Sequence, residues 1–188
     1  FCLSRGLGDV YKRQFLAHSV QLILEILEPI IAREKRQVTS QLPEDLLIWV
    51  DELRLRQVLL NLLSNALKYT PIGSCIAITS ECMNDEQLQE LSTTGSAEPA
   101  AAGLNPGTFV VLALRDWGPG ISPAEQALLF TKFARLESAR NSAQRGAGLG
   151  LYLCRQLVEA MGGRIWMQSS GLPGEGATFF VALPSYGP

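Results

Sequence analysis

The sequence RLRQVLLNLLSNALKYTP at residues 54–71 combines a run of leucines with regularly spaced polar residues. At the helical rotation of about 100° per residue, the polar side chains fall within an arc of roughly 80°, so they form one stripe along an otherwise apolar helix. The stripe consists of Arg54, Gln57, Asn61, Asn65 and Lys68. Asp51 is a good N-cap for this helix, which we expect to run to about Tyr69 before Pro71 and Gly73 end it.

The two asparagines of this stripe suggest a chemical role, because asparagine is a mediocre helix former. A carboxamide oxygen is a hard neutral ligand that suits Mg²⁺, which also keeps phosphate oxygens and water around it. Lys68 lies one turn beyond them and is placed to neutralise a phosphate. Taken alone, the same stripe also fits the solvent-facing side of an ordinary amphipathic helix.

A second motif, DWGPGI at residues 116–121, follows a strongly apolar predicted strand at residues 108–115. An ionised aspartate only accepts hydrogen bonds, so Asp116 at the edge of a pocket suits an exocyclic amine such as N6 of adenine. Gly118 and Gly120 allow the backbone to approach a flat ring closely. The alternative is an ordinary tight turn after the strand, which the same residues also favour.

A third motif, GAGLGL at residues 146–151, opens a predicted amphipathic helix at residues 149–161. Free backbone amides at the start of a helix suit a phosphate, and Arg145 directly upstream is placed to reach a terminal phosphate. No Lys-Ser/Thr pair follows the glycines and no strand precedes them, so the motif is neither a P-loop nor a dinucleotide fingerprint. A flexible loop that leads into a core helix is the alternative.

Composition limits the class of protein. Hydrophobic residues make up 47% of the 188 residues, which is enough for a core, and the net charge of −2 gives no broad field for nucleic acid or an anionic membrane. The four cysteines show neither a CxxC pair nor a metal spacing, so we expect reduced thiols and a cytoplasmic location, either of a free protein or of the cytosolic part of a membrane-bound sensor. No apolar run in this chain approaches the roughly 20 residues of a membrane span.

The order of the predicted elements favours an α+β fold, a two-layer α/β sandwich in which a mixed sheet packs on helices. A helix is expected at residues 15–36, where Pro29 should kink or split it. The composition of residues 83–107 is typical of a flexible surface loop. Residues 1–14 are expected to be a non-native or disordered leader. Further strands are expected at residues 37–42, 46–50, 74–82, 164–169 and 177–183, and a short helix at residues 123–129.

Together, the three motifs resemble the ATP-binding catalytic domain of bacterial sensor histidine kinases, within the ATPase group shared with DNA gyrase, heat-shock chaperones and mismatch-repair ATPases. They are similar to the asparagine box and the two glycine boxes of that family, and FTKFAR at residues 130–135 is similar to its phenylalanine box. Residues 162–169 and 176–179 also fit the end of the family's domain. The resemblance covers about residues 15–184 and implies the Bergerat ATP-binding fold.

The resemblance implies a division of the chain and a set of phosphate contacts. Residues 15–36 would be a connecting helix from a missing dimerisation domain, residues 37–184 the catalytic domain, and residues 185–188 a tail. Asn65 would ligate Mg²⁺ with Asn61 close by. Catalytic roles in contacting or positioning the phosphates are implied for Asn61, Lys68 and Arg145.

The resemblance also implies how adenine is bound. Asp116 would accept from N6, Tyr69 would pack on the adenine or ribose, and Thr178 would support Asp116 through water. Residues 134–147 would form a lid over the triphosphate, anchored by Phe130 and Phe133. Further nucleotide contacts are implied for Gly118, Gly120, Ile121, Phe133, Gly146, Gly148, Leu149, Gly150 and Leu151.

Asn61 narrows the expected reaction. In the hydrolysing relatives this position is typically a glutamate that activates water, whereas an amide cannot act as a general base at neutral pH. Phosphoryl transfer to an acceptor is therefore favoured, since it depends mostly on positioning and charge neutralisation. The family's acceptor is a histidine on a two-helix dimerisation domain, and the only histidine here, His18, lacks the acceptor motif.

These expectations describe a histidine kinase that transfers the γ-phosphate of Mg·ATP to a histidine outside this chain. The expected partners are a histidine-containing dimerisation domain and the receiver domain of a response regulator, with no nucleic acid and no membrane contact by this chain. Trp117 departs from the smaller or polar residue common in the family, which leaves the pocket shape open. The alternatives are a catalytically silent nucleotide-binding regulatory module, a serine kinase of the anti-sigma type and a stand-alone ATPase.

Overall fold

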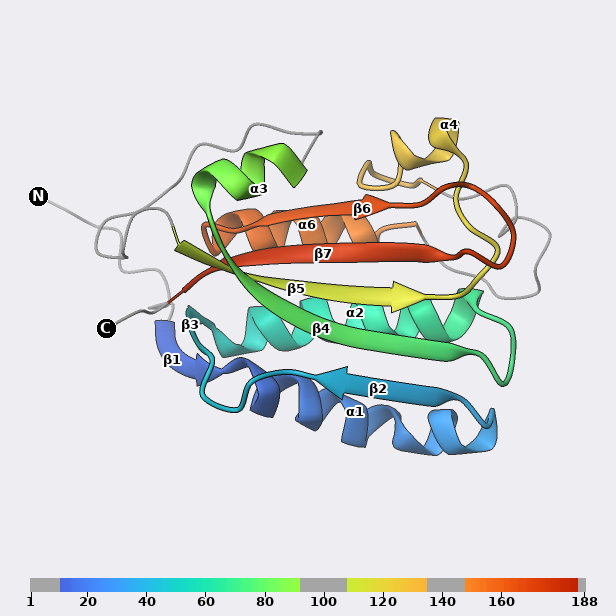
Figure 1. The fold of residues 1–188 in the computed structure, drawn as a ribbon, viewed down its shortest axis with the longest axis horizontal. Coiled ribbons are helices and arrows are strands. Elements are labelled where there is room, and N and C mark those ends of the chain that lie inside the picture. The colour runs from blue at the N-terminus through green and yellow to red at the C-terminus, as the bar shows by residue number, and fades with distance from the viewer. Residues whose placement is uncertain (1–10, 92–107, 135–147, 186–188) are drawn as a thin grey trace, which may run out of the picture.

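A computed structural model describes residues 11–91, 108–134 and 148–185. The described chain forms two layers, in which a five-stranded mixed sheet is covered on one face by three long helices (Figure 1). The strand order is β2 (Gln37–Gln41), β4 (Cys75–Asn84), β5 (Thr108–Asp116), β7 (Ala177–Pro184) and β6 (Arg164–Gln168). The three helices are α1 (Leu16–Arg33), α2 (Glu52–Tyr69) and α6 (Gly150–Ala160). The predicted two-layer α+β architecture is confirmed.

The main core lies between the sheet and the helices. Alternate side chains of β4, β5 and β7 point toward the helix layer, where they meet the leucines of α2. Only β2 and β4 run parallel, and the other neighbours are antiparallel. None of the described helices combines the length and the hydropathy that a membrane crossing needs.

Helix α2 begins and ends as the sequence predicts. Asp51 Oδ1 accepts hydrogen bonds from the backbone amides of Leu53 at 2.8 Å and Arg54 at 3.1 Å, so it caps two amides that have no partner within the helix. At the other end Thr70 is the C-cap, and its amide bonds to the carbonyl of Ala66.

Helix α1 continues through Pro29, so the expected split at this residue does not occur. A buried stripe of Leu16, Val20, Ile23 and Leu27 holds the helix on the core. Pro29 lies on the exposed side, where water can bond to the carbonyl that proline leaves without a backbone donor. Packing along the whole stripe therefore outweighs the loss of one hydrogen bond.

The expectation that residues 1–14 stand apart from the fold is wrong for residues 11–14. Strand β1 (Tyr11–Phe15) pairs antiparallel with β3 (Leu47–Asp51) in a separate two-stranded sheet. This pairing uses backbone groups and leaves Lys12 and Arg13 exposed, so no apolar periodicity marks it in the sequence. Residues 1–10 lie outside the described part of the chain.

The prediction of a flexible loop at residues 83–107 is wrong for residues 83–91. Strand β4 extends to Asn84, and helix α3 (Asp85–Leu91) follows it directly. Asn84 and Gln87 cap the start of α3 reciprocally: the Gln87 amide donates to Asn84 Oδ1 at 2.8 Å, and the Asn84 amide donates to Gln87 Oε1 at 3.0 Å. Residues 92–107 lie outside the described part.

Helix α3 covers a second, smaller core. Leu88 is fully buried and packs in a cluster with Phe109, Val111, Trp166 and Ala182. Phe109 and Val111 alternate along β5 with the residues that face α2, so this cluster lies on the opposite face of the sheet. The short α4 (Pro123–Gln126) begins with a capping box between Ser122 and Glu125, close to the short helix predicted at residues 123–129.

We expect Leu88→Ala to destabilise the fold by about 2–5 kcal/mol, because it removes a fully buried side chain and leaves a cavity under α3. Urea unfolding measures the change, and Glu90→Ala on the exposed side of α3 is the matched control. Equal stability of the two variants would show that α3 does not pack on the sheet.

Candidate functional site

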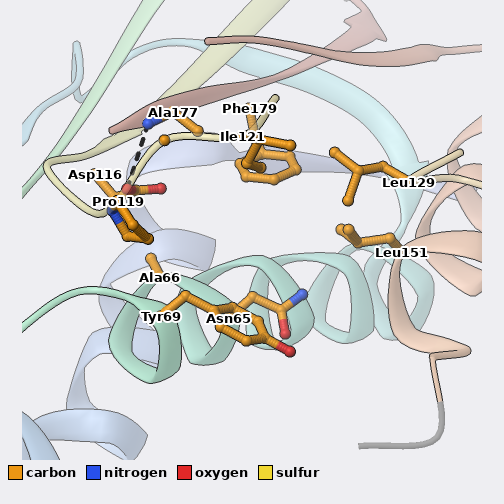
Figure 2. A pocket seen from close by; sticks show the side chains of 11 residues that line it. Asn65, Ala66, Tyr69, Asp116, Pro119, Ile121, Leu129, Leu151, Ala177 and Phe179 are labelled. Carbon is orange, nitrogen blue, oxygen red and sulfur yellow. Dashed lines mark hydrogen bonds between the residues drawn. The ribbon is translucent and has the colours of Figure 1, made fainter. Parts of the chain in front are cut away.

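A pocket opens between α2 and the ends of β5 and β7 (Figure 2). Figure 2 shows Asn65 and Tyr69 of α2 on one side and Asp116 and Pro119 on the other. The lining residues are Asn65, Ala66, Tyr69, Asp116, Pro119, Gly120, Ile121, Leu129, Leu151, Ala177 and Phe179. The pocket therefore joins residues from all three motifs of the sequence.

Asp116 is the only carboxylate among the lining residues. Its Oδ1 accepts hydrogen bonds from the backbone amides of Gly118 at 2.9 Å and Ala177 at 3.4 Å. Burial raises the pKa of the Asp116 carboxyl above its ordinary value, and these two amide donors act in the opposite direction. Its Oδ2 has no hydrogen bond to the described residues, so it can accept one from a ligand.

Two glycines permit the close packing around Asp116. A Cβ on Gly118 would lie 2.9 Å from Asp116 Oδ1 and 3.4 Å from the carbonyl oxygen of Tyr69. Gly176 has φ of +68°, and a Cβ there would lie 1.9 Å from the backbone oxygen of Asp116. Any larger residue at Gly176 would displace β5 or β7, and the sequence analysis gave Gly176 no role at the site.

Two polar side chains hold the Gly118–Ile121 turn, and neither was predicted from the sequence. Ser169 Oγ accepts from the Ile121 amide at 3.0 Å and donates to the Gly176 carbonyl at 2.6 Å. Gln126 Nε2 donates to the carbonyls of Ile121 at 2.7 Å and Ser169 at 2.8 Å. Gln126 lies outside every motif, and Ser169 lies in a stretch whose residues were given no individual roles. Only the tertiary contacts therefore reveal what the two side chains do.

The remainder of the lining is largely apolar. Figure 2 shows Ile121 and Phe179 above α2, with Leu129 and Leu151 at one end of the pocket. Ile121, Leu129 and Phe179 each expose less than a tenth of their surface. An apolar slot with one free carboxylate oxygen suits a flat heterocycle that carries an amino group.

Asn61 lies beyond the pocket lining, toward the start of α6. A Cβ on Gly150 would lie 3.7 Å from Asn61 Oδ1, so the asparagine faces the first residue of that helix. Its Nδ2 is buried, has no oxygen or nitrogen partner among the described residues, and faces the Cys154 thiol, which is only a weak acceptor. A buried amide with so weak an acceptor is costly, so an oxygen acceptor at this place would stabilise it.

The described residues include no group of three or more histidine, cysteine or acidic side chains that could hold a metal ion. A metal at this site would therefore need carboxamide and ligand oxygens. Such a hard oxygen set suits Mg²⁺, and the Asn61–Asn65 face of α2 fits it.

The structure brings six of the predicted site residues into the pocket lining: Asn65, Tyr69, Asp116, Gly120, Ile121 and Leu151. Gly118 and Gly150 lie beside it through the contacts described above. Lys68 Nζ lies 4.9 Å above the centre of the Tyr69 ring, outside the lining. Phe133 and Leu149 are exposed by 69% and 39%, and neither lines the pocket.

Of the predicted site residues Arg145, Gly146 and Gly148, only Gly148 lies in the described part of the chain. Gly148 has φ of +69°, and a Cβ there would lie 2.6 Å from the carbonyl oxygen of Ala134. Arg145 and Gly146 lie outside the described residues, as does the lid predicted at residues 134–147 except for Ala134.

Thr178 is not in the pocket, contrary to the expectation that it supports Asp116. Its neighbours Ala177 and Phe179 both line the pocket, and successive side chains of a strand point to opposite faces. Thr178 is paired with Arg115, whereas Ala177 is paired with Asp116 and donates its amide to the carboxylate. The backbone of Ala177 supports Asp116 in place of a hydroxyl group.

Comparison with known proteins agrees with this arrangement. A family model described as histidine kinase-, DNA gyrase B-, and HSP90-like ATPase matches residues 50–187. The adaptive-response sensory kinase SasA of Synechococcus sp. (strain JA-3-3Ab) is 35% identical over 172 residues, which cover 91% of this chain and 39% of that protein. SasA of Thermosynechococcus vestitus is 34% identical over 190 residues, which cover 97% of this chain and 43% of that protein. The chain thus spans about two-fifths of the length of these relatives.

Solved structures share the fold. The catalytic domain of histidine kinase ThkA superposes with a TM-score of 0.69 at 24% identity, covering 94% of this chain and 99% of that one. The mycobacterial sensor histidine kinase MprB gives a TM-score of 0.68 at 21% identity, covering 95% of this chain and all of that one.

The raised pKa of Asp116 makes folding stability depend on pH. A carboxyl whose folded-state pKa lies above its unfolded value of 3.8 contributes stability that is fully present below pH 3.8 and is lost as the pH rises through the raised pKa. We expect Asp116→Asn, which has no charge to desolvate, to lose less stability than the unsubstituted protein from acid to neutral pH. Urea unfolding at a series of pH values measures both curves, and parallel curves would contradict the burial of this charge.

Proposed function

The chain belongs to the family of histidine kinase-, DNA gyrase B- and HSP90-like ATPases, and on this premise we propose that it is the catalytic domain of a sensor histidine kinase. In this proposal it binds Mg·ATP and transfers the γ-phosphate to a histidine on a dimerisation domain. The observation that carries the proposal is the apolar pocket that Asp116 enters with one carboxylate oxygen free of hydrogen bonds to the described residues. The SasA relatives, which are sensory kinases by name, support the same activity.

Adenine fits the apolar end of the pocket. The Asp116 carboxylate would accept from the exocyclic amine, while Ile121 and Phe179 would contact the ring. Tyr69 is 37% exposed at the pocket edge, where its ring would pack on the adenine or ribose. These contacts select a heterocycle with a donor at the position where guanine has a carbonyl.

The phosphates would extend from this pocket toward the start of α6. Asn65 would contribute its carboxamide oxygen to Mg²⁺, and Asn61 would donate its buried amide to the phosphates or to water. When bound, Mg²⁺ neutralises charge on the phosphate oxygens. The first amides of α6 and the cation of Lys68 would add positive potential along the same path.

The lining favours transfer over hydrolysis. Its only carboxylate, Asp116, lies at the adenine end, and Asn61 at the phosphate end is an amide. A general base must lie within hydrogen-bond reach of the proton that it removes, so no side chain of the described lining serves to activate water. The histidine acceptor would supply its own nucleophile, which leaves positioning and charge neutralisation to this chain.

The partners follow from the proposed reaction. A histidine-containing dimerisation domain would present the acceptor, and the receiver domain of a response regulator would take the phosphoryl group next. The structure of ThkA in complex with the response regulator TrrA, which shares this fold at 23% identity, supports the second partner. We propose a cytoplasmic location, where ATP and a receiver domain are both present.

We expect Mg·ATP to bind about tenfold or more tightly than Mg·GTP, because guanine would leave the Asp116 oxygen without a donor inside an apolar pocket. Calorimetry with ATP, ADP and GTP measures the difference. Asp116→Asn should narrow it, since an amide donates as well as accepts, and Asp45→Asn on the exposed surface should not. Equal affinity for ATP and GTP in the unsubstituted protein would remove the adenine role of Asp116.

We expect labelled ATP to leave the chain itself without acid-labile label and to label a supplied histidine-bearing dimerisation domain. Asn65→Ala should lower this transfer about a hundredfold or more, because it removes a metal ligand, whereas Gln21→Ala on the exposed side of α1 should not change it. Nucleotide binding without any transfer would favour the alternative, a catalytically silent regulatory module. Label on His18 would contradict the assignment of the acceptor to another domain.

A further inference from the structure

Arg36 is a buried cation outside every motif of the sequence. It lies between α1 and β2, and its side chain is only 3% exposed. Arginine is almost never fully buried unless it is paired, so this position needs an explanation.

The guanidinium of Arg36 forms hydrogen bonds with backbone carbonyls at the end of α2. Its Nη2 donates to the backbone carbonyl of Leu67 and, at 2.9 Å, to that of Thr70. Its Nε donates to Glu34 Oε2 at 2.8 Å, and the Glu34 backbone carbonyl accepts from the Gly73 amide at 3.1 Å. The Arg36–Glu34 pair therefore joins the end of α1 to the last turn of α2 and to the residues that follow it.

This contact provides hydrogen-bond donors for carbonyl groups that have no partner within the helix. The last carbonyls of an α-helix have no amide partner, and the negative end of the helix dipole favours a cation. Arg36 Nη1 is itself buried without a hydrogen-bond partner among the described residues, so the arrangement carries a cost. A cost at this position indicates that the geometry of the last turn matters.

The same turn forms part of the pocket. Leu67 and Thr70, whose carbonyls Arg36 holds, bracket Tyr69 in the chain, and Tyr69 lines the pocket. On its other side the turn meets Gly118, where a Cβ would lie 3.4 Å from the Tyr69 carbonyl oxygen and 3.6 Å from Thr70 Cγ2. The last turn of α2 is thus held between Arg36 and the turn that carries Asp116.

We propose that Arg36 is a positioning residue for the nucleotide: by holding the carbonyls of Leu67 and Thr70, it sets the last turn of α2 and, through it, the orientation of Tyr69. The proposal rests on the proposed nucleotide-binding function. Arg36 touches no ligand, so its influence passes entirely through this turn.

The first test uses the protein without nucleotide. We expect Arg36→Met to speed hydrogen exchange of the Thr70 amide about tenfold or more, and to leave the Leu112 amide in the centre of β5 unchanged. Arg36→Lys retains one donor group and should have an intermediate effect. Arg33→Met is the matched control, since Arg33 is 73% exposed and pairs with the same Glu34 but does not bond to the carbonyls of Leu67 and Thr70. An unchanged Thr70 amide, or equal acceleration at Leu112, would overturn the local role of Arg36.

The second test separates positioning from general stability. We expect Arg36→Met to weaken ATP binding about tenfold, but to weaken it less than about threefold when Tyr69→Ala is already present, because coupled residues are not additive. Equal losses in both backgrounds would overturn the proposal and leave the proposed function standing. If the unsubstituted chain binds no adenine nucleotide, the proposed function fails first, and the nucleotide role of Arg36 fails with it.

Discussion

Burial of the leucines of α2 against the sheet is the interaction on which the rest of this structure depends. Leu55, Leu59, Leu62 and Leu63 expose 1% of their surface or less, and each contributes on the order of 1.5–3 kcal/mol relative to an exposed side chain. Rotation of the helix by one residue in one direction would bring Asn61 and Asn65 to the buried positions of Leu62 and Ala66. The helix therefore has one orientation, and this orientation directs Asn65 and Tyr69 into the pocket.

The interface between α2 and α6 is also fully buried at its centre. Cys154 of α6 is fully buried, its Sγ lies 3.9 Å from the carbonyl oxygen of Val58, and burial raises the pKa of the thiol to about 12. A thiol in this environment stays protonated and serves as packing. Cys75, Cys82 and Cys154 are all unpaired, as expected for reduced cysteines.

The buried charge of Asp116 lowers the folding stability and provides a hydrogen-bond acceptor in the pocket. Its carboxylate is partly removed from water, which disfavours the charge, and two backbone amides offset only part of that cost. Gly118 and Gly176 make this arrangement sterically possible, while Ser169 and Gln126 hold the turn in place. The result is a charged acceptor with a fixed direction inside an apolar slot, which is the arrangement that the proposed recognition of an amino-substituted ring would need.

The sequence by itself determined the elements whose signals are local: the cap at Asp51, the polar stripe of α2, and the strand and turn that end at Asp116. These depend on helical periodicity, side-chain capping and glycine conformation, which neighbouring residues encode. Only the tertiary structure decided the pairing of β1 with β3, the docking of α3, the exclusion of Thr178 from the pocket and the contacts of Arg36. Each of these depends on partners far apart in the chain, and backbone pairing or a single buried polar contact leaves no periodic trace in the sequence.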